Sequence, residues 1–213
     1  NLDLNDFEIG SGGVLVTPNT TPLVVAGGKD GRMFLLNSAS LGGFTPGGPD
    51  HVLDMHNIGQ CWCAPSYFVG PDGIGRVVSS GGNHVMTWKI MQTGSPPTPQ
   101  LVQEGFGLIS ANVTTIQDPG FFTSVSSNGT LPNHSTIIWA VGRPPDGSTS
   151  VTLYAFDAMP VDGTLPLLGQ YPAGTWTGRS NANIVPVVSN GKVYVASSGG
   201  VGAGTLTILG FNP

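Results

Sequence analysis

The stretch "HVLDMHNIGQCWCAPSYF" holds the densest set of side chains that could ligate a metal or react. His51, Asp54, His56, Cys61 and Cys63 all fall within it. Thiolates and imidazoles suit copper or zinc, so one interpretation is a metal site built from these residues. The chain has only 2 cysteines, so the second Cys pair of a structural zinc site is missing.

The spacing Cys61-x-Cys63 also permits a disulfide. On a flat strand the two Cα atoms would lie about 6.5 to 7 Å apart, and a disulfide usually joins Cα atoms about 4.4 to 6.8 Å apart. A turn or bulge at Gly59-Gln60 would bring the sulfurs together. Three interpretations therefore stay open: a short disulfide, a metal site, or two buried free thiols.

Polar segments offer candidates for glycan chemistry. Trp176 stands in the polar loop "GTWTGRSN", where an exposed indole would stack on a sugar ring or pack on its own sheet. Sequons for N-glycosylation fall in turn-like segments. They begin at Asn19, Asn112, Asn128 and Asn133.

Composition limits the class of protein. The chain has 33 Gly and 18 Pro, and only 9% of its residues are charged, against the usual quarter or so. The net charge of −5 with 7 basic residues argues against a nucleic-acid partner. No apolar run is long enough to predict a membrane span. Sparse charge and abundant small polar residues favour a secreted or periplasmic protein, as a mature chain or a portion of a longer one.

A hairpin recurs along the chain. It appears as "PLVVAGGKDGRMFLLN", "GRVVSSGGNHVMTWKI", "STIIWAVGRPPDGSTSVTLYAFD" and "GKVYVASSGGVGAGTLTILGF". A further strand precedes each hairpin, and a fourth segment follows three of them. Four strands repeated roughly every 50 to 60 residues predict an all-β chain, a single β-propeller domain of about four blades over 1–213. Stacking such sheets radially buries both faces of each sheet.

The expected blades and inner strands can be placed by residue number. The blades are predicted at approximately 10–58, 62–106, 121–172 and 183–213. The inner strands are predicted near 12–17, 64–69, 121–127 and 183–189. The last blade lacks a strand, so we expect residues 1–9 to pair with residues 205–211 and close the ring. The alternative is an open half of a ring of about eight blades.

The first hairpin turns at "GGKDG", which superficially suggests a phosphate-binding loop. Asp30 and the missing Ser or Thr after Lys29 argue against that interpretation. Asp-Gly between apolar runs favours a type I′ hairpin turn. We therefore expect Lys29 and Asp30 at an exposed tip without catalysis, and Gly31 with a positive φ.

Several of these segments resemble one family. "VVAGGKDGRMFLLNSASLGG", "CAPSYF" and "NANIVPVVSNGKVYVASSGG" are similar to repeats of quinoprotein-like (PQQ-like) β-propeller proteins. The resemblance implies the propeller fold, and in the dehydrogenases of that family it implies PQQ held near a calcium ion. This chain departs from them because the adjacent cysteines and the repeated Trp-docking motif are absent. We therefore expect the fold without the cofactor, and PQQ, calcium or copper only in an alternative reading.

These observations predict a function of binding rather than catalysis. We expect an extracytoplasmic propeller that serves as a scaffold or binds a protein or glycan partner. That partner includes the rest of its own propeller or a second copy of the chain. The alternative is a PQQ-dependent or metal-dependent oxidoreductase of the quinoprotein type.

Overall fold

The protein is all-β in every part that the structure describes. A computed structural model describes residues 7, 12–18, 22–43, 45–48, 51–110, 120–129, 136–142, 144, 148–176, 184–200 and 203–210. Within these ranges every regular element is a strand, and the strands form four separate antiparallel sheets. The described residues contain no helix that is long and apolar enough to span a membrane. The all-β prediction is confirmed.

The first two sheets are four-stranded meanders, in which each strand pairs with the next along the chain. The first sheet holds β1 (Val14–Val16), β2 (Leu23–Gly27), β3 (Arg32–Asn37) and β4 (Asp54–Asn57). The second sheet holds β5 (Ser66–Val69), β6 (Gly75–Ser79), β7 (His84–Thr93) and β8 (Thr98–Leu108).

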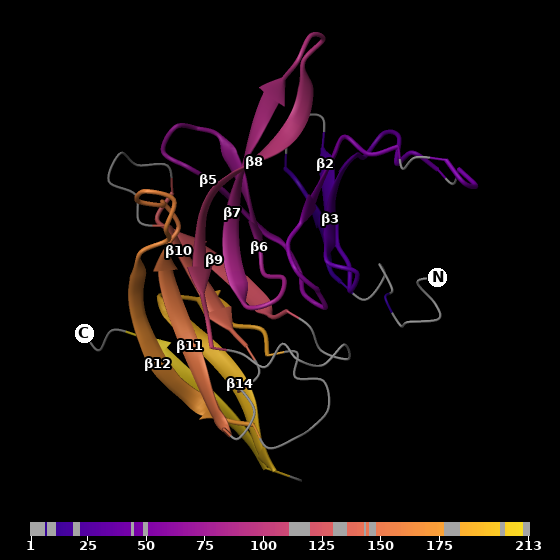
Figure 1. Cartoon of the computed structure of the whole chain (residues 1–213). Coiled ribbons are helices and arrows are strands. Elements are labelled where there is room, and N and C mark those ends of the chain that lie inside the picture. Colours follow the sequence, from indigo (N-terminus) through magenta and orange to yellow (C-terminus); the bar gives the residue numbers. More distant parts are fainter. Residues whose placement is uncertain are drawn as a thin grey trace.

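The third and fourth sheets repeat this order. The third sheet holds β9 (Phe122–Ser127), β10 (Thr136–Val141), β11 (Ser150–Asp157) and β12 (Leu167–Thr175). The fourth sheet has three strands among the described residues: β13 (Val187–Ser189), β14 (Lys192–Gly200) and β15 (Ala203–Gly210). In Figure 1 the sheets follow the sequence from indigo through magenta and orange to yellow.

The strands arise from β-branched and aromatic residues with a two-residue period. In β2, for example, Leu23, Val25 and Gly27 are buried while Val24 and Ala26 are only half-buried. Alternation of this kind gives each sheet two faces, both of them largely apolar. Each sheet must therefore pack on another sheet to remove its apolar faces from water.

Three apolar clusters hold successive sheets together. The first lies between the first two sheets, and it includes Leu35 of β3 and Trp88 of β7. The second lies between the second and third sheets, and it includes Val85 of β7 and Phe156 of β11. A third cluster joins the third sheet to the fourth and includes Val195 of β14. Each sheet in the middle of the series is therefore covered on both faces.

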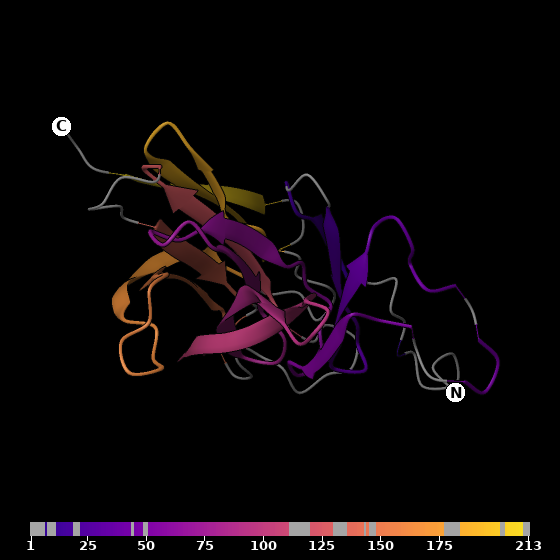
Figure 2. The same cartoon turned by 90° about the horizontal axis from the view of Figure 1, so that it is seen from above.

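The first strands of successive sheets adjoin. The Gly13 amide, next to β1, donates to the Cys63 carbonyl at 2.8 Å, and Ala64 forms a parallel bridge with Phe122 of β9. The Ser124 hydroxyl of β9 donates to the Pro186 carbonyl just before β13. The strands β1, β5, β9 and β13 lie inside the four ranges expected for inner strands. Figure 2, seen from above, shows the first sheet (indigo) on one side of the molecule and the third and fourth sheets (orange and yellow) on the other.

The expected closing strand lies outside the described residues, apart from Phe7. What the structure does describe are the outward faces of the two end sheets. Val14 of β1 and Leu206 of β15 are 63% and 58% exposed, so the first and fourth sheets do not cover each other there.

The first hairpin corner corrects two expectations. The Gly31 amide donates to the Gly28 carbonyl at 3.0 Å, so the turn spans Gly28 to Gly31. Gly31 has φ 88°, as predicted, but Lys29 and Asp30 have no positive φ, so the turn is not type I′. Lys29 is only 4% exposed, so the expectation of an exposed tip is wrong. The segment before the second sheet lies on this corner: the Cys61 amide donates to the Gly28 carbonyl at 3.1 Å, and the Lys29 ammonium lies 5.2 Å from the centre of the Trp62 ring.

Candidate functional site

Cys61 and Cys63 form a disulfide. The chain bends at these residues before β5 begins, and the bend brings the Cα atoms to 5.0 Å, closer than on a flat strand. Both cysteines are buried in the first apolar cluster. Because the sulfurs are bonded to each other, they do not supply the thiolates that a metal site here would need.

The two histidines proposed beside them have different surroundings. His51 is exposed, whereas the His56 ring packs on Trp88 with 4.6 Å between the ring centres. The His56 Nε2 lies 2.9 Å from Asp54 Oδ2, which also accepts a hydrogen bond from the Leu101 amide at 2.7 Å. His56 and Asp54 thus join the first sheet to the second. Among the described residues no group of three or more His, Cys, Asp and Glu side chains is arranged to hold a metal ion.

Trp176 and one sequon can be placed. Trp176 is half-buried against the third apolar cluster, and its amide donates to the Thr149 carbonyl at 2.8 Å. Asn128 is exposed just beyond β9, followed by Gly129 with φ 97°. The other three sequon asparagines, Asn19, Asn112 and Asn133, lie outside the described residues.

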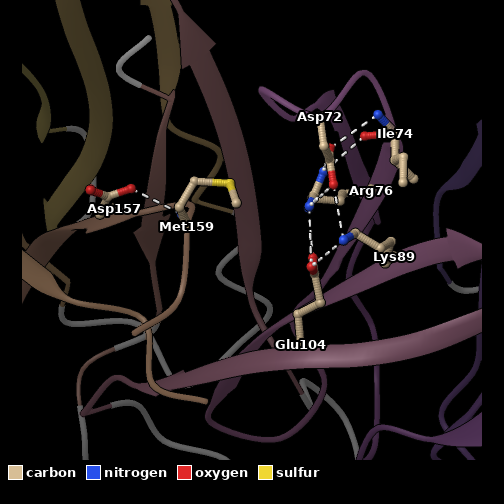
Figure 3. Close-up of polar contacts among 7 residues, drawn as sticks. All are labelled: Asp72, Ile74, Arg76, Lys89, Glu104, Asp157 and Met159. Atoms are coloured by element: carbon tan, nitrogen blue, oxygen red, sulfur yellow. Dashed lines mark hydrogen bonds and ion pairs between the residues drawn. The ribbon is translucent and has the colours of Figure 1, made fainter. Parts of the chain in front are cut away.

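The sequence analysis missed a charge cluster around a buried arginine in the second sheet (Figure 3). Arg76 of β6 is 1% exposed. Its Nε donates to Glu104 at 2.6 Å, and its Nη1 donates to Asp72 at 2.8 Å. Its Nη2 reaches the second oxygen of both carboxylates, so each pair is bidentate. The Lys89 ammonium lies 2.9 Å from Asp72 and 3.2 Å from Glu104.

The opposite charges in this cluster stabilise one another. The hydrogen bond from Arg76 holds the pKa of Asp72 well below its usual range. Burial disfavours the charged guanidinium, but its bonds to Asp72 and Glu104 raise the pKa of Arg76. The bonds to the same carboxylates raise the pKa of Lys89. Arg76 and Lys89 therefore place two cations between the Asp72 and Glu104 carboxylates. The cluster ties the β5–β6 turn to β7 and β8, which is a structural task.

One feature of the sequence indicates this charge cluster. Asp72, Arg76, Lys89 and Glu104 are among the few charges in an otherwise apolar and small-residue stretch. A charge inside a predicted buried strand needs a partner, but the sequence does not say which of several acids supplies it.

An open depression of about 350 Å³ lies where the first two sheets meet. Its wall on the first sheet is the end of β4, and its wall on the second sheet comes from β7 and β8. The residues that line it are uncharged or imidazole-bearing: Asn57, Ile58, Gly59, His84, Met86, Gln103 and Phe106. Phe106 is 42% exposed.

The depression is held by backbone contacts. A Cβ at Gly59 would lie 3.1 Å from the Gly82 nitrogen, and a Cβ at Gly81 would lie 2.4 Å from the Gly59 oxygen. The two segments approach this closely because neither glycine has a side chain. Phe106 is fixed from the other side, where its amide donates to the Gly163 carbonyl at 3.1 Å and its carbonyl accepts from the Leu165 amide at 2.9 Å. These contacts fix the backbone at Gly59 and Phe106, on two sides of the depression.

The lining of the depression combines one aromatic ring with polar side chains. Phe106 supplies the ring, and Asn57, Gln103 and His84 supply hydrogen-bonding groups. Apolar surface with a few polar groups is the lining expected of a small-molecule site. The sequence analysis assigned stacking to Trp176, because it did not bring the strand ends of two sheets together.

Comparisons with known proteins give no identification. No family model, no curated protein and no solved structure matches the chain. The resemblance of individual segments to quinoprotein-like repeats therefore remains a prediction.

Proposed function

We propose that the chain is a β-propeller module that works outside the cytoplasm and binds a neutral glycan without catalysing a reaction on it. The depression at the junction of the first and second sheets is the binding site. The observation that carries the proposal is the exposed Phe106 ring among hydrogen-bonding side chains in a preformed hollow. The fold supports the propeller, because apolar clusters bind each sheet to the next and the first strands adjoin.

Two observations support a location outside the cytoplasm. The Cys61–Cys63 disulfide suits an oxidising compartment. Asn128 is exposed within its sequon, so a glycan attached there would meet solvent. Secretion of the chain with a glycan on Asn128, detected as a mass loss on enzymatic deglycosylation, is the expected result.

Binding to neutral oligosaccharides tests the proposed activity. A panel of neutral hexose oligosaccharides is screened against the purified chain, and the best binder is titrated by calorimetry. Phe106→Ala should weaken binding about tenfold or more, because it removes the stacking surface. Leu108→Ala is the matched control, since Leu108 is an exposed apolar residue on the same strand outside the depression. Binding by Phe106→Ala equal to that of the parent, or no binding by the parent, contradicts the proposal.

A further inference from the structure

The outward face of the fourth sheet is apolar and exposed. Val187 of β13 pairs with Tyr194 of β14, which pairs with Ile208 of β15. Ala196 pairs with Leu206 on the same face. Val187, Leu206 and Ile208 are 54%, 58% and 52% exposed. The opposite face of this sheet, by contrast, supplies Val193 and Val195 to the third apolar cluster.

The outward face of the first sheet has the same character. Val14 pairs with Ala26, Ala26 with Phe34, and Phe34 with Met55, so these side chains share a face. Val14 and Met55 are 63% and 46% exposed, and Val16 on the same face is 57% exposed, whereas Phe34 is 6% exposed. The fourth sheet thus presents a broad exposed apolar face, and the first sheet presents exposed apolar residues around the buried Phe34.

Arg32 and Lys192 are charged residues on these two faces, and each stands beside a turn. The Arg32 Nε bonds to Asp30 at 2.6 Å, and its guanidinium lies over the Phe34 ring, 4.9 Å from the ring centre. Successive turns of a meander lie at opposite ends of the strands, so the two cations would not meet if the faces packed together. Arginine is among the residues enriched at protein interfaces.

The equivalent faces inside the series are buried. On the side that faces the preceding sheet, Val77 and Trp88 of the second sheet and Ile138 and Phe156 of the third are at most 3% exposed. The outward face of the first sheet is likewise the side that would face a preceding sheet. It carries residues of the same kind, and among the described residues no apolar cluster joins it to another sheet.

The contacts between first strands define how a further sheet would join. Ser66 of β5 bonds to Thr123 of β9, and Ser124 of β9 bonds to Pro186 before β13. If this arrangement of first strands is repeated once more, β13 lies beside β1 of another molecule. Val187 would then face Val14 across the new interface.

We propose that two copies of this chain associate head to tail. The outward face of the fourth sheet of each copy packs on the outward face of the first sheet of the other. Two such contacts, related by a two-fold axis, close one ring of eight sheets and leave neither apolar face exposed. This interface repeats the packing already present between successive sheets, and it is independent of the proposed glycan site.

Sedimentation equilibrium of the purified chain and of three variants tests the proposal. The parent should sediment at twice the 21.9 kDa of one chain. Leu206→Glu, on the fourth sheet, and Val16→Glu, on the first, should each be monomeric, because each places a charge in both contacts of the ring. Val161→Glu is the control, since Val161 is 63% exposed on a turn away from both faces and should leave the dimer intact.

A mixture of two variants separates this arrangement from its alternatives. Leu206→Glu and Val16→Glu together should recover a dimer, because one copy keeps its first-sheet face and the other keeps its fourth-sheet face. Circular dichroism of each variant shows that it has folded. A monomeric parent overturns the proposal, as does a parent larger than a dimer. A dimer that survives Val16→Glu overturns the head-to-tail arrangement and indicates contact between like faces.

Discussion

The second sheet and the fourth sheet carry the same kinds of side chain but have different surroundings. Val77 and Val78, adjacent on β6, point to opposite faces of the second sheet, and both are fully buried. On the fourth sheet Val195 is fully buried, whereas Leu206 is 58% exposed on the opposite face. An apolar residue in a strand of this protein therefore indicates a face built for packing. Only the neighbouring sheet decides whether that face is covered.

The largest expected effect comes from Arg76, the buried charge of the second sheet. Arg76→Ala should lower the free energy of unfolding by about 3–5 kcal/mol, because it leaves Glu104 and Asp72 without their main partner. The control is Arg32→Ala, whose guanidinium is 35% exposed and pairs with Asp30. It should cost about 1 kcal/mol or less. Urea denaturation measures both. Equal losses would show that burial does not distinguish the two arginines.

A comparison of covered and uncovered apolar residues follows. Leu153→Ala should cost about 2–5 kcal/mol at every protein concentration, since Leu153 is fully buried in the third cluster. Ile208→Ala should cost less, and its cost should fall as the protein is diluted, because the residue is covered only by a second copy. Thermal unfolding at two concentrations, one hundredfold apart, is the measurement. A concentration-independent loss at Ile208 would contradict the comparison.

A substitution at the first hairpin corner should have an effect of intermediate size on stability. Lys29→Ala should cost about 1 kcal/mol, more than an exposed lysine, because it removes a buried stem and a cation–π contact with Trp62. Lys192→Ala, at an exposed lysine, is the control and should change stability by about 0.5 kcal/mol or less. Melting temperatures that fall equally for the two variants would be inconsistent with the buried position of Lys29.

The smallest expected effect is on pH dependence. The pKa of Asp72 is lower in the folded protein than in the unfolded chain, where it is about 3.9. Its contribution to stability is therefore present above about pH 4 and is lost as the pH falls below that value. The contribution is below about 1 kcal/mol because the side chain is 35% exposed and solvent screens it. Denaturation at pH 7 and pH 3 should show a smaller acid loss for Asp72→Asn than for the parent.

The repeat could be predicted because each strand is marked by alternating apolar residues in its own sequence. Alternating apolar residues and Gly, Asn or Asp turns placed the strands and the Gly31 conformation correctly. The type I′ geometry predicted for Asp30-Gly31 occurs instead at Asp162-Gly163 and Asn190-Gly191, where both residues have positive φ. The first hairpin contains more residues between its strands, so its turn is set by loop length rather than by the Asp-Gly pair.

The site could not be predicted, because it depends on contacts between distant segments. Phe106 and Asn57 are far apart in the sequence, and only the packing of the first sheet on the second makes them neighbours. The residues next to Lys29 in the sequence do not indicate that it is buried, because it packs against Trp62 of the next repeat. Cysteine spacing permitted the disulfide, but the bend that brings the Cα atoms to 5.0 Å has no unambiguous sequence signal.

Cross-linking of engineered cysteines tests most directly whether the two uncovered faces meet in a second copy. The native cysteines are joined to each other, so a short bismaleimide reacts only with introduced thiols. Mixed Val14→Cys and Val187→Cys chains should give a two-chain product that neither variant gives alone. A chain with both substitutions should likewise link to another chain. Linkage within a single chain of 21.9 kDa would show that the first and fourth sheets close on each other, and would contradict the account.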